Sequence, residues 1–401
     1  MEPFAHLHVH TEFSLLDGQC KIKKLWEKAA KDNMPGFAIT DHGNMCGVVE
    51  FYQQCHKQGV KPIIGCEVYV AVGSRFTKTN RGMYHLILLA ENNQGYHNLM
   101  KIVSAGQVEG FYYKPRVDKD ILRAYSEGLI CLSACIAGEL PVQILNNNMD
   151  GARSVIREFI DIFGKDNYFL EMQDHEMAQE HKVNESLVKL AEEFDLRLVC
   201  TNDSHYVHKE DWEAQDILLC IQTTSTVDEP NRMRFPNGGF YLKSYDEMAE
   251  KFHWCPQCLE NTNKIADRCH VTLEFGKLLL PKFETEDGSD EKTYLRHLCD
   301  INLPRCYPNA DKTVYDRLDF ELGIINQMGY AAYFLIVWDF VNYSRSREIP
   351  VGPGRGSGAG SLVAYCMLEA CLMHIAAGVG KRYVAAIPER SLVAVVEECA
   401  G

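Results

Sequence analysis

The sequence lacks any run of apolar residues long enough to cross a lipid bilayer. Its amino terminus also lacks the basic stretch and apolar core that mark a secretory signal. Positive charge is not in excess, because 55 acidic residues outnumber 41 lysines and arginines and give a formal net charge of −14. These absences argue against a secreted or membrane protein and against a generic nucleic-acid coating protein, and they predict a cytoplasmic chain with no membrane partner.

The 16 cysteines also lack any regular spacing along the 401 residues. Because disulfide frameworks are typical of small secreted domains, we expect these thiols to be reduced. The composition, 46% hydrophobic and 24% charged, is that of an ordinary globular chain with two or three domains.

What the sequence does contain is an alternation of short apolar runs with amphipathic segments. The expected strands are residues 5–10, 36–41, 62–70, 84–90, 128–133, 168–173 and 196–202. The clearest expected helices are residues 22–31, 48–57, 152–163 and 183–194, in which apolar positions recur every three or four residues. This order predicts an α/β fold with a parallel sheet and crossover helices, and seven strands are enough to close a barrel.

Side chains that bind metal ions stand mostly at or just after the ends of these strands. His8 and His10 are two residues apart, so on a strand both imidazoles project to the same side. Asp203 and His205 form a second such pair at another strand end. The remaining candidates are Asp17, His42, Glu67, His85 and Cys135.

A single strand histidine is usually a core residue, and a single buried cysteine is usually inert. Two pairs at separate strand ends are hard to explain by packing. Imidazole, carboxylate and thiolate together suit zinc, manganese or iron better than magnesium alone. We therefore predict a polynuclear metal site at the carboxyl ends of the strands, where barrels build their active sites.

The chain resembles the polymerase-and-histidinol-phosphatase (PHP) domain of bacterial DNA polymerase III alpha subunits, followed by the start of that polymerase's palm. The segments that carry the resemblance are His8–Ser14, Leu16–Gly18, Thr40–Gly43, Phe111–Arg116, Leu132–Cys135, Thr201–Tyr206, Tyr333–Phe340 and Pro350–Ser357. It implies three parts: a distorted seven-stranded PHP barrel at residues 1–275, the first part of a polymerase-beta-like palm at 276–368, and a divergent tail at 369–401.

The resemblance further implies up to three zinc, manganese or iron ions. The implied ligand sets are His8, His10, Glu67 and Asp203 for one ion, Glu67, His85 and Cys135 for a second, and Asp17, His42 and His205 for a third. Closely spaced ions can clamp the oxygens of a phosphoester and generate hydroxide from bound water. The prediction is a 3′-to-5′ exonuclease acting on DNA primer-template, with His10, Glu67 and Asp203 as catalytic residues.

Two basic segments are candidates for DNA contacts. The loop at residues 73–82 carries Arg75, Lys78 and Arg81, and Lys114 and Arg116 stand beside three aromatic residues. Cationic side chains hold phosphates and aromatic rings stack on bases. Each segment has an alternative interpretation, a solvated hairpin for the loop and core packing for the aromatic residues.

Residues 352–361 are rich in glycine and contain one cation, which allows close approach to a triphosphate. A glycine run alone is more often a flexible turn, but the resemblance implies nucleotide binding by Arg355, Gly356, Ser357 and Ser361. No aspartate follows Asp339, whereas polymerisation needs paired aspartates that hold magnesium. We therefore expect no polymerase chemistry from this chain, with magnesium serving only that absent centre. A truncated or frame-shifted product, or a private C-terminal substitution, explains the tail.

Three classes of function remain open. The first is a piece of a DNA-directed DNA polymerase of DNA replication whose PHP barrel is an exonuclease. The second is a free phosphomonoesterase of the histidinol-phosphatase kind, which would share the metal ligands but not the glycine-rich segment. The third is a catalytically silent docking module for the sliding clamp or other replisome subunits.

Overall fold

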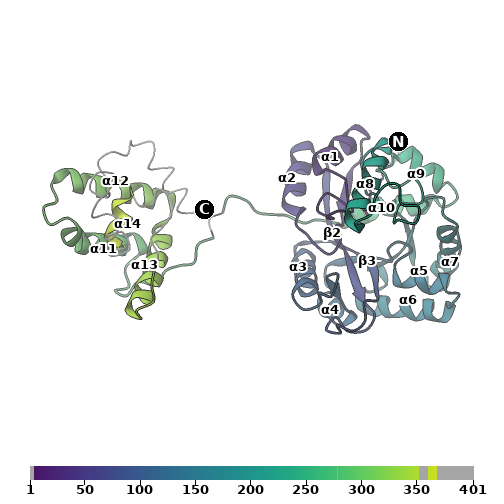
Figure 1. The fold of residues 1–401 in the computed structure, drawn as a ribbon, viewed down its shortest axis with the longest axis horizontal. Helices are drawn as coiled ribbons and strands as arrows, with labels where there is room; N and C mark the ends of the chain where they lie inside the picture. Colours follow the sequence, from purple (N-terminus) through teal and green to yellow (C-terminus); the bar gives the residue numbers. More distant parts are fainter. Residues whose placement is uncertain (1–3, 278, 352–359, 368–401) are drawn as a thin grey trace. The chain divides into compact units, whose positions relative to one another are not determined.

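The computed structural model describes residues 4–277, 279–351 and 360–367. The chain divides into two compact units, Met1–Glu274 and Phe275–Gly401, each with its own hydrophobic core (Figure 1).

Unit 1 is built on a curled sheet with helices packed on it. Its strands are β1 (Gly36–Ile39), β2 (Lys61–Ala71), β3 (Met83–Ala90), β4 (Arg116–Val117), β5 (Leu129–Leu132), β6 (Tyr168–Met172) and β7 (Arg197–Cys200). Its α-helices are α1 (Ile22–Lys31), α2 (Val48–Gln58), α3 (Asn93–Val108), α4 (Lys119–Ala124), α5 (Glu139–Leu145), α6 (Met149–Phe163), α7 (Ala178–Phe194), α8 (Trp212–Thr223), α9 (Tyr245–Lys251) and α10 (Pro256–Arg268). Short 3₁₀ turns, η1 (Lys165–Asn167) and η2 (Lys209–Asp211), precede β6 and α8.

The sheet is mixed, which corrects the prediction of a parallel sheet. Its strand order is β1-β2-β3-β5-β6-β7, and β4 also pairs with β2. β3 runs antiparallel to both β2 and β5, whereas the β1–β2, β5–β6 and β6–β7 pairs are parallel. The connection between β2 and β3 is residues 72–82, and this is too short for the crossover that parallel neighbours need.

Residues 5–10, predicted as the first strand, form only isolated bridges, and β4 supplies the seventh strand instead. His6 bridges to Phe37 of β1, and Val9 bridges to Ser204 beyond β7. Backbone hydrogen bonds run from Thr40 N to Val9 O at 2.9 Å and from His10 N to Ser204 O at 2.8 Å. This segment therefore lies between the two outer strands and closes the curl, and the predicted seven-stranded α/β architecture is confirmed.

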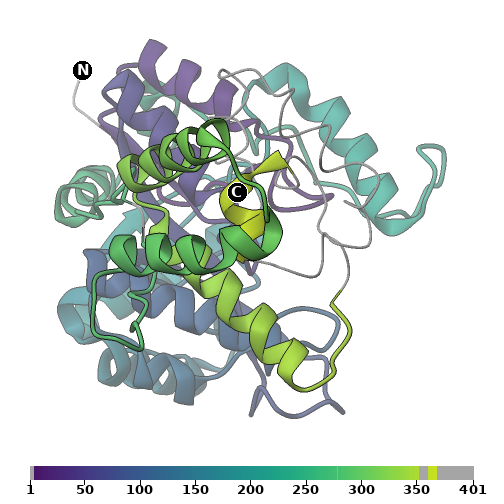
Figure 2. The ribbon, with the colours of Figure 1, turned by 90° about the vertical axis from the view of Figure 1, so that its left-hand side faces the viewer.

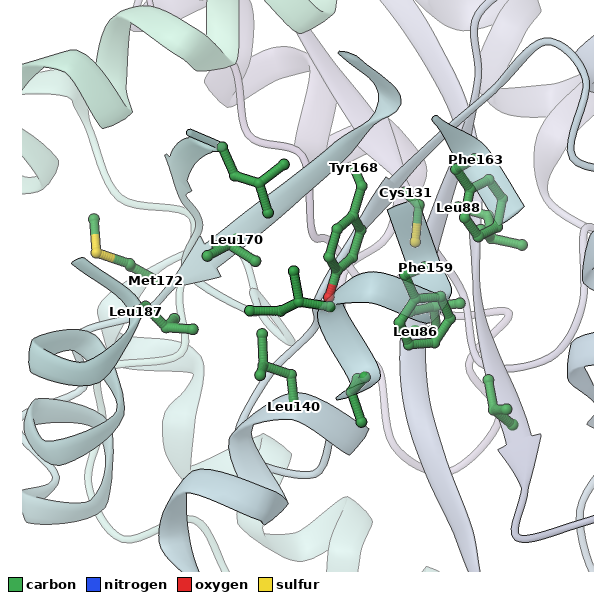
Figure 3. Packing of buried hydrophobic residues seen from close by; sticks show 14 of the residues in the cluster. Leu86, Leu88, Cys131, Leu140, Phe159, Phe163, Tyr168, Leu170, Met172 and Leu187 are labelled. Atoms are coloured by element: carbon green, nitrogen blue, oxygen red, sulfur yellow. The ribbon is translucent and has the colours of Figure 1, made fainter. Parts of the chain in front are cut away.

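The main core of unit 1 lies between the sheet and helices α5, α6 and α7. Figure 3 draws Leu86 of β3 beside Phe159 of α6 and Leu88 beside Phe163, and all four belong to this core. Ile87 and Leu89, the intervening residues of β3, belong to a second buried cluster on the other face, as expected for a period of two. Both faces of β3 are thus buried, and the strand reads as a continuous apolar run rather than an alternating one.

Unit 2 is helical in its described residues. Its helices are α11 (Glu291–Cys306), α12 (Lys312–Met328), α13 (Ala331–Ser346) and α14 (Leu362–Met367). In Figure 2 the short yellow-green helix α14 lies among the green helices of this unit, and its Leu362, Val363 and Cys366 are fully buried. No single helix among the described residues is long and apolar enough to cross a membrane. The helices α12 and α13 meet these criteria only when taken together, and they are bent by 109° relative to each other.

We expect limited proteolysis to cut first in residues 275–290, which precede the helical core of unit 2. The described residues of this stretch contain no helix or strand, and Leu279 is 86% exposed. Proteases need a locally extended, accessible backbone, which this stretch offers at little cost in free energy. Mass spectrometry of the first stable fragment checks the site, and a first cut within α1 to α10 would contradict the expectation.

Candidate metal centre

The nine predicted ligand side chains converge at one edge of the curled sheet. His8 and His10 come from the closing segment and Asp17 from the loop before α1. The others lie on strands or just after them: His42 after β1, Glu67 in β2, His85 in β3, Cys135 after β5, and Asp203 and His205 after β7. Residues separated by almost 200 positions in the sequence thus share one site.

His85 departs from the expected position at a carboxyl end. It lies near the amino end of β3, where its register partner is Tyr69 near the carboxyl end of β2. Because β3 is antiparallel to β2, the start of one strand and the end of the other reach the same edge of the sheet. Glu67 lies two residues earlier in β2, and its backbone is bridged to His42.

The first predicted ligand set is assembled in the structure. The ligating atoms of His8, His10, Glu67 and Asp203 all lie within 4.8 Å of one another. Nε2 of His8 is 2.7 Å from Glu67 Oε2 and 3.2 Å from Asp203 Oδ1. Nε2 of His10 is 3.2 Å from the same two oxygens. Four donors facing one small volume are a sufficient set for a transition-metal ion.

The third predicted set is also brought together. Nε2 of His42 is 3.0 Å from Asp17 Oδ2, and Nε2 of His205 is 4.0 Å from Asp17 Oδ1. His10 joins this group as well, because ligating nitrogens of His10, His42 and His205 lie within 4.8 Å of one another. His10 therefore stands between two groups of donors, which the sequence did not indicate.

The second predicted set is centred on the other oxygen of Glu67. Glu67 Oε1 is in ion-pair contact with His85 Nδ1 and is 3.4 Å from His42 Nδ1. The Cys135 sulfur is 3.6 Å from His85 Nδ1. The two carboxylate oxygens of Glu67 consequently face different groups of donors, as a bridging ligand requires.

Three buried polar atoms at this edge test whether the site fits a cation. His42 Nδ1, Glu67 Oε1 and Asp203 Oδ1 are buried and make no hydrogen bond of acceptable geometry, although each lies within ion-pair distance of another group. Leaving buried polar atoms without hydrogen bonds is costly. Metal ions held by the separate groups of donors would satisfy these atoms, so the donor set and its geometry fit the predicted metals.

The protonation of the donors is strongly coupled. Burial disfavours a charged His8, but Asp203 and Glu171 outweigh it and raise the pKa of His8 well above its ordinary value. Burial is likewise outweighed at His42, where Glu67 and Asp17 raise the pKa to about 10. Despite its burial, Glu67 has a pKa well below the ordinary range because His85 and His42 are close. Metal binding would displace protons from these imidazoles.

His205 and Cys135 differ from the other donors. Burial and the charge of His10 lower the pKa of His205 to about 4, so this imidazole is neutral. Its Nδ1 lies 2.9 Å from the carbonyl oxygen of Asp203, which leaves Nε2 available as a ligand. Burial and the charges of Asp203 and Glu67 raise the pKa of the Cys135 thiol, so a thiolate there requires a cation.

Glu171 was missed by the sequence reasoning and orients His8. Its Oε1 lies 2.7 Å from His8 Nδ1, the nitrogen opposite the one that faces Glu67. Its other oxygen accepts a hydrogen bond of 2.9 Å from the Ala134 backbone N–H, and Thr201 donates to Oε1. A carboxylate behind a metal-binding histidine fixes its tautomer and ring orientation. The signal was present, since Glu171 is the one charged residue in the apolar strand β6.

Asp41 organises the closing segment in a similar way. It accepts hydrogen bonds from the Thr11 backbone N–H at 2.6 Å, the Thr11 hydroxyl at 2.7 Å and the Ser14 hydroxyl at 2.6 Å. The Ser14 oxygen in turn lies 3.1 Å from His10 Nδ1. Asp41 therefore sets the position of His10 through Ser14.

Two residues near the donors adopt left-handed backbone conformations. Asp203 has a φ of 44°, and Ala134, which precedes Cys135, has a φ of 65°. Residues other than glycine rarely adopt such angles, and they concentrate at functional sites. The turns after β5 and β7 thus direct ligand side chains at an energetic cost that the fold supports.

The basic side chains of the loop at residues 73–82, which were predicted to contact DNA, make contacts with other groups of the protein. Arg75 donates to Glu109 at 2.7 Å and to Asp118 at 2.8 Å. Lys78 donates to the backbone carbonyl of Glu109 at 2.7 Å. Arg81 lies over the ring of Tyr113 at 3.6 Å.

Arg116 is not placed as predicted. The side chain is 1% exposed, and its guanidinium donates to the carbonyls of Asn80 at 2.6 Å and Thr77 at 2.7 Å. Arg116 therefore anchors the loop at residues 73–82 and is not available to bind a phosphate. This corrects the prediction that Arg116 contacts DNA. Lys114, whose Nζ lies 5.6 Å from the Tyr69 ring centroid, is partly exposed.

Of the predicted nucleotide-binding residues, Arg355, Gly356 and Ser357 lie outside the described residues. Ser361 is 6% exposed, and its hydroxyl donates to the buried carboxylate of Glu321 at 2.9 Å. Glu321 also accepts from the Val363 backbone N–H at 3.1 Å. In this position Ser361 ties the start of α14 to α12.

Comparisons with known proteins match both units. Residues 6–175 match the family model for the PHP domain, and residues 293–370 match the model described as the bacterial DNA polymerase III alpha NTPase domain. The DNA polymerase III alpha subunits of Borreliella burgdorferi and Treponema pallidum are each 46% identical over 91% of this chain and 32% of the relative. That of Thermus aquaticus is 39% identical over 91% of this chain and 35% of the relative. The chain thus spans about a third of the length of these relatives.

Among solved structures, a two-domain protein from Bacteroides vulgatus containing a PHP-like metal-dependent phosphoesterase is 14% identical. It has a TM-score of 0.33 and overlaps 53% of this chain and 54% of that one.

Proposed function

Because this chain belongs to the bacterial DNA polymerase III alpha family and carries a PHP domain, we propose that its metal centre hydrolyses DNA phosphodiesters as a 3′-to-5′ exonuclease. The observation that carries the proposal is the convergence of nine metal-binding side chains, with the two oxygens of Glu67 facing different groups of donors. The relatives are named for a polymerase, so family membership indicates an enzyme family. The reaction of this metal centre is inferred from the residues that form it.

The donors divide naturally among up to three ions. His8, His10, Glu67 and Asp203 would hold one, Glu67, His85 and Cys135 a second, and Asp17, His42 and His205 a third. When bound, such ions neutralise phosphate charge and lower the pKa of water, which supplies hydroxide for attack. Zinc, manganese or iron suits the mixed nitrogen, oxygen and sulfur donors.

The residues of the chain would orient the reaction in three ways. Glu67 would fix the spacing between ions, since its two oxygens point to separate groups. Asp203, held in a left-handed turn, and His10, placed by Ser14, would aim the remaining lone pairs at the same volume. We assign catalytic roles to His10, Glu67 and Asp203 on this basis.

The test compares two substrates with the purified full chain. We expect metal-dependent removal of the terminal nucleotide from a 3′-mispaired primer, and no comparable turnover of p-nitrophenyl phosphate, a small phosphomonoester. A chelator should abolish the reaction and added manganese or zinc should restore it. Preference for the small phosphomonoester would instead indicate a phosphatase of the histidinol-phosphatase kind.

Metal analysis of the same preparation provides a second check. We expect about two to three transition-metal ions per chain, because the donors form three overlapping groups rich in imidazole. Elemental analysis by mass spectrometry measures this content. Loosely held magnesium alone would contradict a centre of this composition.

The polymerase reaction itself is expected to be absent from this chain. No aspartate follows Asp339 within these 401 residues, and polymerisation requires paired carboxylates that hold magnesium. A primer-extension assay under conditions that allow hydrolysis should show no incorporation. Template-dependent incorporation would show that residues 276–401 had been misinterpreted. For the whole protein, we propose a cytoplasmic replisome in which DNA primer-template and the sliding clamp are partners.

A further inference from the structure

A large pocket lies next to the metal centre, where the chain continues from His205. Its volume is about 1300 Å³, and residues between 206 and 216 and between 227 and 238 line it. The first range spans η2 and the start of α8, and the second is the loop that follows α8. Apart from Tyr206, which ends the segment Thr201–Tyr206, none of these residues was singled out from the sequence.

The pocket wall is in direct contact with one of the predicted metal ligands, and the helix α8 that forms part of it contacts the backbone of another. The ring of Phe235 meets the ring of His205 edge-on, with centroids 4.9 Å apart, and stacks on Phe240 at 4.3 Å. From α8, Gln215 donates a hydrogen bond to the backbone carbonyl of Asp17. A ligand in the pocket would therefore have one end beside the donors of the third set.

The loop that forms the outer wall is held in place by partly buried polar contacts. Arg232, whose side chain is 3% exposed, donates to Asp216 of α8 through two nitrogens at 2.6 and 2.5 Å. Asn237 donates to the backbone carbonyl of His175 at 2.5 Å. Because the protein's own side chains fix this wall, the pocket is formed in advance, which lowers the entropic cost of binding.

Two exposed cations, Lys209 and Arg234, line the pocket wall. Within the described ranges, Lys209 and Arg234 make no hydrogen bond and no ion pair. Asp216 is neutralised by Arg232, so Glu210 is the remaining acidic side chain on the wall. Exposed cations of this kind suit a flexible phosphate backbone.

Aromatic surface accompanies these cations. Trp212 at the start of α8 lines the pocket and is 49% exposed, and Phe235 is partly buried on the side of the metal centre. Aromatic side chains beside cations form the stacking platforms that bind single-stranded nucleic acids with little sequence preference. The volume also exceeds the roughly 300–1,000 Å³ of ordinary small-molecule pockets, so it can hold more than one nucleotide.

We infer that this pocket binds the unpaired terminal nucleotides of a single DNA strand and presents their phosphodiester to the metal centre. Trp212 would stack on a base, and Lys209 and Arg234 would hold the flanking phosphates. The inference rests on the proposed exonuclease function and names the part of the substrate that the pocket takes: a short frayed end, not a base-paired duplex.

The experiment measures binding without catalysis. The full chain is titrated against a fluorescein-labelled short oligothymidylate in the presence of a chelator, and fluorescence anisotropy reports affinity. We expect Trp212→Ala to weaken binding by about tenfold and Trp212→Phe to retain most of it. Arg234→Ala changes an exposed side chain and leaves packing intact. It should reduce the slope of log affinity against log salt concentration by roughly 0.7, the value for one lost phosphate contact on a single strand.

The matched control is Trp254→Ala, because Trp254 is 48% exposed but lines a different pocket beside α7 and α10. Equal affinities of the Trp212→Ala and Trp254→Ala chains, or no binding by the unaltered chain, would overturn the inference. Binding that depends on Trp212 in a chain with no exonuclease activity would support the pocket and overturn the proposed function. Hydrolysis of the mispaired primer, combined with DNA binding that does not depend on Trp212, would support the proposed function and overturn the inference about the pocket.

Discussion

Replacing Glu67 with alanine is expected to abolish hydrolysis of a mispaired primer, with a loss of more than about a hundredfold in rate. Changes to residues that only support metal ligands typically cost about 10–100-fold, and Glu67 would contact two groups of donors directly. Its removal also leaves His8 and His85 without the carboxylate that both contact. Metal content should therefore fall together with activity.

The measurement pairs elemental analysis with the nuclease assay on the same samples. Because breaking a buried ion pair can cost roughly 3–5 kcal/mol, circular dichroism is needed to show that the variant is folded, and Glu67→Gln offers a variant of the same volume. Glu50→Ala, an exposed change on α2, should leave both quantities unaltered. Normal metal content with retained activity in folded Glu67→Ala would mean that the centre has been placed incorrectly.

Glu171→Gln is expected to lower metal affinity and activity by about 10–100-fold, the range seen for carboxylates behind metal-binding histidines. Glutamine keeps the volume and can still accept from the Ala134 N–H, but it removes the negative charge from His8 Nδ1. Since Glu171 positions a ligand without contacting substrate, excess metal should restore much of the activity. Metal titration of the hydrolysis rate measures the shift.

The structure offers a close control for this variant. His175 and Glu180 form another buried pair at 2.7 Å, outside the ligand sets. Glu180→Gln should cost comparable stability in a thermal melt and leave the metal titration unchanged. If both variants shift the titration equally, Glu171 supports only the fold.

Local patterns predicted two of the expected helices closely. The segment 22–31 was predicted from apolar spacing and is α1 with the same bounds, and 48–57 differs from α2 by one residue. Helix formation depends on neighbours three and four positions apart, so the information lies within the segment itself. The same is true of the strands at 62–70 and 84–90, whose apolar runs are long.

Pairing between distant segments could not be predicted in this way. Residues 5–10 have a strand-like pattern, yet their hydrogen bonds are set by β1 and by residues after β7. The direction of β3 depends on the short connection to β2 and on its partner β5. Likewise the charge of Arg116 indicated a surface contact, but backbone carbonyls of residues 77 and 80 surround its guanidinium.

The sequence by itself determined the chemical types of the metal donors, their pairing as His8 with His10 and Asp203 with His205, and the alternation that produces an α/β unit. Tertiary structure alone decided that His10 stands between two donor groups, that Glu67 turns its oxygens to different neighbours, and that Glu171 lies behind His8. Donor type is a property of each residue, whereas the distance between donors depends on sheet register and closure. Sheet register and closure depend on contacts between segments that are far apart in the chain, and the local periodicity of the sequence does not specify these contacts.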